Sequence, residues 1–104
     1  MTASNQRTDS VNVGILGTGC IADFHHAALK LLPQVKVQAV CDLNRTLAKQ
    51  FADMKGIPNV YFDLGEMLAK ENLDVVHVLT PPNIHFQTAS QILDAGVDAF
   101  IEKP

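Results

Sequence analysis

Short runs of β-branched and other apolar residues alternate strictly with segments whose apolar residues are spaced three and four apart. Extended runs are expected at 11–16, 35–42, 60–62, 75–79 and 97–101. Such alternation predicts a parallel sheet whose right-handed crossovers place helices on both faces. The run Val75–Leu79 is almost wholly apolar, which is typical of a central parallel strand. We therefore predict an α/β fold with a doubly wound parallel sheet of about five strands.

Capping and breaking residues bound the helical segments between these strands. Pro33 ends the first helix, and Asp63 precedes a short helix with Glu66 three residues later, the spacing of a capping box. His26 is expected to face solvent, and His77 is expected to be a hydrogen-bonded core histidine. The residues predicted to form the inner face of the first helix are Ile21, Phe24, His25, Ala28, Leu29 and Leu32.

The size and composition suit one globular domain. The chain has 104 residues, 47% of them hydrophobic, and a net charge of −3, which argues against nucleic-acid binding. Neither its two cysteines nor its four histidines have metal-ligand spacing, so we predict no metal site. Residues 1–10 are polar and are expected to be a flexible leader before a domain at 11–104. No apolar run could cross a bilayer, and the cytoplasm is the expected compartment.

A glycine-rich motif lies between the first strand and the first helix. Residues 17–22 read Gly-Thr-Gly-Cys-Ile-Ala, a form of the dinucleotide-binding fingerprint. Gly17 permits a tight turn, Gly19 lets the backbone approach a pyrophosphate, and Ala22 keeps the helix close to the strand. The free N–H groups at the start of the helix would then face the anion. The alternative is an ordinary strand–helix turn.

Asp42 ends the second strand about 20 residues after this motif, where a dinucleotide-binding fold places an acid on the adenosine ribose. A carboxylate there would repel a 2′-phosphate, so the sequence favours NAD, with NADP as the alternative. Arg45 is a further candidate cofactor contact, over the adenine or on a phosphate. Its alternative role is that of a solvated helix residue.

Two more strand ends carry unusual chemistry. Thr80-Pro81-Pro82-Asn83 follows the fourth strand, and Glu102-Lys103-Pro104 follows the fifth. Ligands of open α/β sheets bind outside the carboxyl ends of the strands, where these segments would converge. The Lys103 ammonium could donate to a substrate oxygen and stabilise negative charge on it, with Glu102 holding it in place. The alternative for residues 80–83 is a rigid loop that merely ends the strand, and the alternative for Glu102 and Lys103 is a solvated surface pair.

Together these residues resemble the glucose–fructose oxidoreductase, inositol dehydrogenase and rhizopine-catabolism (Gfo/Idh/MocA) family of NAD(P)-dependent enzymes. The resemblance covers nearly all of residues 11–104 and implies a Rossmann-type sheet of order 3-2-1-4-5. The matching segments are residues 17–22, His25, Ala39-Val40-Cys41-Asp42, Thr80 to His85, Ala95-Gly96 and Glu102-Lys103-Pro104.

The resemblance also implies a role for each matching residue. It implies pyrophosphate contacts from Gly17, Gly19, Cys20 and Ile21, and an adenosine ribose contact from Asp42. It implies a nicotinamide side lined by Thr80, Pro81, Asn83 and His85, a ribose contact from Glu102, and substrate binding and proton handling by Lys103 as the catalytic residue.

The function expected on these grounds is hydride transfer between NAD(P) and a hydroxyl of a sugar, cyclitol or nucleotide sugar. Family members carry a second, sheet-rich domain that supplies most substrate contacts and usually the homo-oligomer interface. We expect residues 11–104 to be an incomplete part of such an enzyme, whose turnover alone is doubtful because the hydride site would lie open to water. One alternative is a non-catalytic dinucleotide-binding or sensing module. Another is an S-adenosylmethionine-dependent methyltransferase, in which Glu102-Lys103-Pro104 would have no place.

Overall fold

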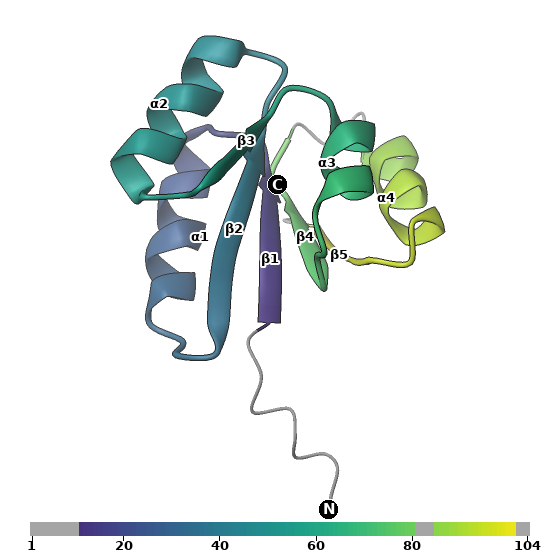
Figure 1. The fold of residues 1–104 in the computed structure, drawn as a ribbon, viewed down its shortest axis with the longest axis horizontal. Helices are drawn as coiled ribbons and strands as arrows, with labels where there is room; N and C mark the ends of the chain where they lie inside the picture. Colours follow the sequence, from purple (N-terminus) through teal and green to yellow (C-terminus); the bar gives the residue numbers. More distant parts are fainter. Residues whose placement is uncertain (1–10, 81–84, 102–104) are drawn as a thin grey trace, which may run out of the picture.

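The computed structural model describes residues 11–80 and 85–101, without the side chains of Cys20 and His85. Strands and helices alternate through this part of the chain (Figure 1). The elements are β1 (Val11–Leu16), α1 (Cys20–Lys30), β2 (Val35–Cys41), α2 (Arg45–Lys55), β3 (Asn59–Tyr61), α3 (Leu64–Lys70), β4 (Val75–Val78), α4 (His85–Asp94) and β5 (Asp98–Ile101). Within the described residues, no helix is both long and apolar enough to cross a membrane.

The strands form one parallel sheet of order β3-β2-β1-β4-β5, which confirms the predicted topology. β1 lies at its centre, with Ile15 opposite Val40 of β2 on one side and His77 of β4 on the other. The chain builds β2 and β3 outward from β1 in one direction, then β4 and β5 in the other. This reversal opens a crevice at the carboxyl ends of the central strands.

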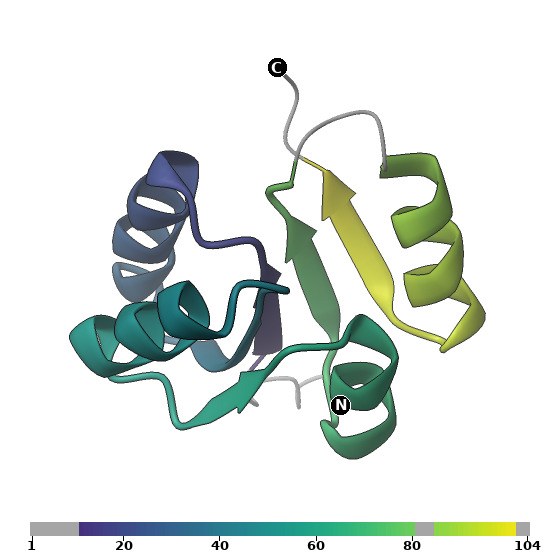
Figure 2. The same cartoon turned by 90° about the horizontal axis from the view of Figure 1, so that it is seen from above.

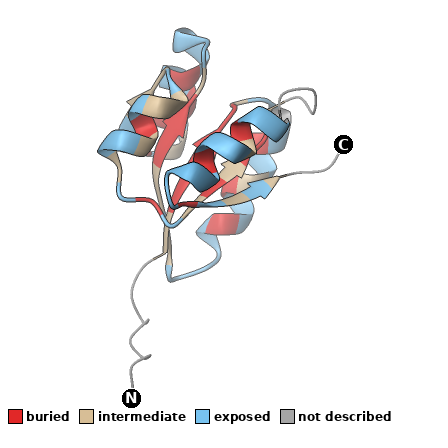
Figure 3. Ribbon diagram, turned by 90° about the vertical axis from the view of Figure 1, so that its right-hand side faces the viewer, coloured by how far each residue is buried: buried red, intermediate tan, exposed pale blue. Residues whose placement is uncertain are grey.

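The helices cover the sheet in two layers, α1 and α2 on one face and α3 and α4 on the other (Figure 2). Figure 3 shows buried residues along the strands and exposed ones on the outer helix surfaces. The core under α1 and α2 consists of Ile15, Ala22, Val40, Phe51, Ala52, Ile57 and Leu79. The core under α3 and α4 consists of Leu16, Ala39, Cys41, Met67, Leu73, Val76, Val78, Ile92 and Val97.

The predicted inner face of α1 is only partly correct. Ala22, His26 and Leu29 are buried, whereas Phe24 is 75% exposed. Ile21, Ala28 and Leu32 are also exposed. The prediction that His26 faces solvent is wrong, because its ring lies edge-on to Phe51 with centroids 6.1 Å apart. Apolar residues occur on two sides of α1, so their spacing alone could not indicate which side meets the sheet.

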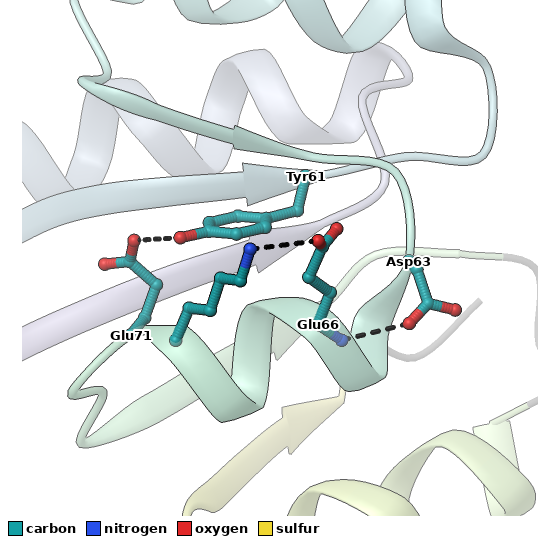
Figure 4. A network of polar contacts seen from close by, with 5 residues as sticks. Tyr61, Asp63, Glu66 and Glu71 are labelled. Carbon is teal, nitrogen blue, oxygen red and sulfur yellow. Dashed lines mark hydrogen bonds and ion pairs between the residues drawn. The ribbon is translucent and has the colours of Figure 1, made fainter.

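Side-chain caps set the starts of α2 and α3. The Asn44 side chain accepts a hydrogen bond from the Leu47 N–H at 3.0 Å, which sets the start of α2 at Arg45. Asp63 caps α3 by accepting from the Glu66 N–H at 2.9 Å (Figure 4). The Glu66 carboxylate pairs with Lys70 at 3.2 Å, so the Asp63 half of the predicted capping box is the half that forms among the described residues.

A second contact in Figure 4 ties α3 to the sheet. The Tyr61 hydroxyl donates to one oxygen of Glu71 at 2.5 Å, and Gln38 Nε2 donates to the other at 3.0 Å. The hydrogen bond to Glu71 raises the pKa of Tyr61 to about 12. Because Tyr61 is in β3 and Gln38 in β2, the two bonds hold the end of α3 against this edge of the sheet.

On the α1 side of β4 and β5, His77 differs from the hydrogen-bonded core histidine expected from the sequence. Its half-buried ring packs against Phe100 and His25, with centroids 4.8 and 5.4 Å away. Its Nδ1 is buried, with no hydrogen-bond partner in the described part of the chain. Burial, and secondarily His25, lowers the pKa of His77 to about 4.

Candidate functional site

A cleft of about 750 Å³ opens at the carboxyl ends of β1, β2 and β4. Small-molecule sites typically measure roughly 300–1,000 Å³, so the cleft is large enough for a cofactor. Its lining residues are Leu16, Gly17, Thr18, Gly19, Ile21, Cys41, Asp42, Leu43, Asp63, Leu64, Leu79, Thr80, Thr88 and Gln91. They come from both helical layers as well as from the central strands.

Gly17 makes the turn at the end of β1. Its φ of 102° lies in the region that favours glycine, and its N–H donates to the Cys41 carbonyl at 2.8 Å. A Cβ at this position would lie 3.2 Å from the Leu79 carbonyl carbon, tighter than ordinary contact. Gly17 is therefore required by the fold itself, because it lets the turn pass close to the backbone after β4.

Gly19 is the N-cap of α1 and provides no side-chain hydrogen bond to the helix. A Cβ at Gly19 would meet nothing within 4 Å, so the space in front of this turn is open. The first N–H groups of a helix lack intrahelical acceptors and carry its positive dipole end. Ala22 is fully buried beneath them, which holds α1 close to the sheet as predicted. The start of α1 can thus accept an anion from the cleft.

Asp42 points toward this turn. Its Oδ2 accepts hydrogen bonds from the Thr18 N–H at 3.0 Å and from the Thr18 hydroxyl at 2.7 Å. Its Oδ1 accepts from the Asn44 N–H at 2.9 Å. The carboxylate is half-buried, lines the cleft and lies directly beside the glycine turn.

These features fit a dinucleotide. The open turn before α1 suits a pyrophosphate, and the carboxylate beside it suits the hydroxyls of a neighbouring ribose. The space for the pyrophosphate is the same space that a Cβ at Gly19 would enter.

The sequence model of an oxidoreductase family with an NAD-binding Rossmann fold, Gfo/Idh/MocA, matches residues 11–104. The chain belongs to this family. The Gfo/Idh/MocA match confirms the resemblance seen in the sequence and identifies NAD as the cofactor of the fold.

Curated Gfo/Idh/MocA relatives align over most of the chain. An uncharacterised oxidoreductase of Schizosaccharomyces pombe is 38% identical over 98 residues, covering 90% of this chain and 26% of the relative. An inositol 2-dehydrogenase/D-chiro-inositol 3-dehydrogenase of Shouchella clausii is 35% identical over 97 residues, covering 91% of this chain and 28% of the relative. The chain therefore spans about a quarter of the length of these relatives.

Solved structures show the same fold with bound cofactor. Scyllo-inositol dehydrogenase from Lactobacillus casei, with NAD(H) and scyllo-inositol, is 25% identical with a TM-score of 0.84, covering 92% of this chain and 28% of that one. The WlbA dehydrogenase from Chromobacterium violaceum, with NADH and UDP-GlcNAcA, is 28% identical with a TM-score of 0.86. The match covers 91% of this chain and 28% of that one.

The cleft brings together part of the site predicted from the sequence. The predicted residues that line it are Gly17, Gly19, Ile21, Asp42 and Thr80. Arg45 is not among the lining residues, and its guanidinium carbon lies 4.5 Å from the centroid of the Phe62 ring. The candidates Pro81, Asn83, Glu102 and Lys103 lie outside the described residues, as do the side chains of Cys20 and His85.

Several lining residues were not predicted as site residues: Thr18, Leu43, Asp63, Leu64, Thr88 and Gln91. Asp63 and Leu64 follow β3, so the strand-end rule that indicated Asp42 could have indicated them too. Thr88 and Gln91 are three residues apart on α4, and only the packing of α4 against the sheet brings them to the cleft. Nothing in their local sequence signals this placement.

Cys41 lines the cleft but is almost fully buried. Burial, followed by the nearby carboxylates of Asp63 and Asp42, raises the pKa of its thiol to about 12. The thiol is therefore protonated at neutral pH, which makes it a poor nucleophile and a poor redox partner.

Proposed function

We propose that this chain is the cofactor-binding part of an oxidoreductase that transfers a hydride between NAD and a hydroxyl-bearing carbon of a sugar, cyclitol or nucleotide sugar. The observation that carries the proposal is the Asp42 carboxylate held beside an open glycine turn. Membership of the Gfo/Idh/MocA family supports the oxidoreductase class. Relatives named for inositols, and one solved with a UDP-sugar, support a carbohydrate-like substrate.

In this proposal the glycine turn and the start of α1 bind the pyrophosphate. Gly17 shapes the turn, Gly19 leaves room for the phosphates, and the backbone of Cys20 and Ile21 supplies N–H donors. Asp42 accepts a hydrogen bond from the adenosine ribose. A 2′-phosphate beside this carboxylate would be repelled, so NAD is preferred over NADP.

The nicotinamide side is assigned to the segments after β4 and β5. Thr80 lines the cleft at the end of β4, which supports a contact near the nicotinamide ribose. Pro81, Asn83 and His85 extend this wall in the proposal, and Glu102 accepts from the ribose. NAD supplies the hydride acceptor, while Lys103 donates a hydrogen bond to the substrate oxygen and takes part in moving its proton.

Isothermal titration of the chain with NAD and with NADP tests the binding step. We expect NAD to bind, and Asp42→Ala to weaken it by about tenfold, the size of a lost charged hydrogen bond. Asp53→Ala is the matched control, because Asp53 is exposed on α2 and does not line the cleft. Folded protein that binds neither dinucleotide would refute the proposal.

Turnover is a separate measurement. The absorbance of the reduced cofactor is followed with inositols and UDP-sugars as candidate substrates. Hydride transfer that is lost in Lys103→Met, with NAD binding retained, is the result expected of the proposed chemistry. Binding of NAD without turnover of any substrate would favour a non-catalytic dinucleotide-binding module.

A further inference from the structure

The hydrogen bonds around Asp42 distinguish one side chain from its neighbours. Two of the three donors, the Thr18 and Asn44 N–H groups, are backbone groups available from almost any residue. The third is the Thr18 hydroxyl, 2.7 Å from Oδ2, and only threonine or serine could supply it from this position. Within the described part of the chain, Thr18 is thus the one hydrogen-bond donor to Asp42 whose side-chain identity affects how firmly the carboxylate is held.

The three bonds also leave the carboxylate with a defined free side. A carboxylate has about four acceptor positions, two on each oxygen. Thr18 occupies two on Oδ2 and Asn44 occupies one on Oδ1, so among the described residues the position left open is on Oδ1. Both oxygens are anchored, so the group cannot rotate without breaking at least one bond to a charged acceptor.

We propose that Thr18 is a positioning residue that sets the preference for NAD over NADP by holding the Asp42 carboxylate in place. The inference rests on the proposed function, in which Asp42 meets the adenosine ribose. A ribose 2′-hydroxyl can donate to the open position on Oδ1. A 2′-phosphate is largely ionised, and the anchored carboxylate cannot turn away from it.

Positioning differs measurably from simple support of the glycine turn. If the Thr18 hydroxyl only stabilised the turn, its removal would weaken NAD and NADP equally, because the pyrophosphate is common to both. If it holds Asp42, its removal leaves Oδ2 with the Thr18 N–H bond alone, so turning the carboxylate away from a 2′-phosphate costs one hydrogen bond less. The ratio of the two dissociation constants then changes, not merely their size.

The experiment is isothermal titration of the full chain with NAD and NADP, comparing the ratio Kd(NADP)/Kd(NAD). Thr18→Val keeps the N–H donor and branched shape but removes the hydroxyl, and we expect it to lower the ratio by about tenfold. Thr18→Ser restores the hydroxyl and should keep the ratio within about twofold of the original. Thr18→Ala is a second hydroxyl-free variant, for use if valine prevents folding. Thr46→Val is the matched control, because Thr46 is exposed on α2.

A double-mutant comparison tests whether the Thr18 hydroxyl acts through Asp42. In an Asp42→Ala background, Thr18→Val should leave the ratio unchanged, because the group that it positions is gone. An unchanged or increased ratio in Thr18→Val alone, or a persistent effect without Asp42, would overturn the inference. Strong NAD binding with an unchanged ratio refutes only this inference. Absence of NAD binding in the unaltered chain removes both it and the proposed function.

Discussion

Replacing His77 with valine should make the fold less sensitive to acid. The ring is half-buried between His25 and Phe100, and its Nδ1 has no hydrogen-bond partner among the described residues. Burial favours the neutral ring and lowers its pKa from 6.5 to about 4. A lowered folded-state pKa stabilises the fold above about pH 6.5, and this stabilisation is lost as the pH falls toward about 4.

The size of the effect follows from the two pKa values. At about pH 5 the unfolded chain carries a proton on His77 in most molecules, whereas the folded chain does so in few. With one pKa unit worth about 1.4 kcal/mol, His77 lowers the free energy of unfolding by about 2 kcal/mol between about pH 8 and about pH 5. Valine does not titrate, and its branched side chain suits a strand, so the variant should lack this loss.

Urea unfolding at both pH values measures the difference. The unaltered chain should lose about 2 kcal/mol more between about pH 8 and about pH 5 than His77→Val does. Val76→Ala is the control. Val76 is fully buried in β4, so its truncation should lower the free energy of unfolding by the same amount at both pH values. An equal pH-dependent loss in His77→Val and in the unaltered chain would show that the buried imidazole is not responsible.

Two glycine variants should separate folding from binding, and a tyrosine variant should report on α3. Gly17→Ala should destabilise the chain by about 1–3 kcal/mol in urea, since it forces a Cβ into a φ of 102°. Gly19→Ala should change stability by less than about 1 kcal/mol yet weaken NAD binding by about tenfold or more in calorimetry. Tyr61→Phe should cost about 1–2 kcal/mol at neutral pH through the lost bond to Glu71. The pKa of Tyr61 is raised to about 12, so this stabilisation is present below about pH 10 and lost as the pH rises to about 12; the variant should lack that alkaline loss. These expectations would be contradicted if Gly19→Ala bound NAD as tightly as the unaltered chain. They would also be contradicted if Tyr61→Phe lost as much stability at alkaline pH as the unaltered chain.

The order of the elements was readable because each strand and helix has a local signal. Apolar alternation, helical spacing and breaking residues act within a few positions, and the right-handed crossover rule then limits how the strands can be arranged. The same locality made Gly17 and Asp42 predictable, because each directly follows a strand end. Strand bounds differ from the prediction by one residue at the end of β2, at both ends of β3, at the end of β4 and at the start of β5.

The sequence by itself determined the order of strands and helices along the chain, the glycine turn and the acid beside it, since all three follow from short segments, while the resemblance to a known family supplied the sheet order. Only the tertiary structure decided that His26 rather than Phe24 is buried, because α1 has apolar residues on two sides. It also decided that Thr18 holds Asp42 and that Thr88 and Gln91 reach the cleft. These contacts join residues distant in the chain, and their geometry depends on how helices pack on the sheet, which no local pattern encodes.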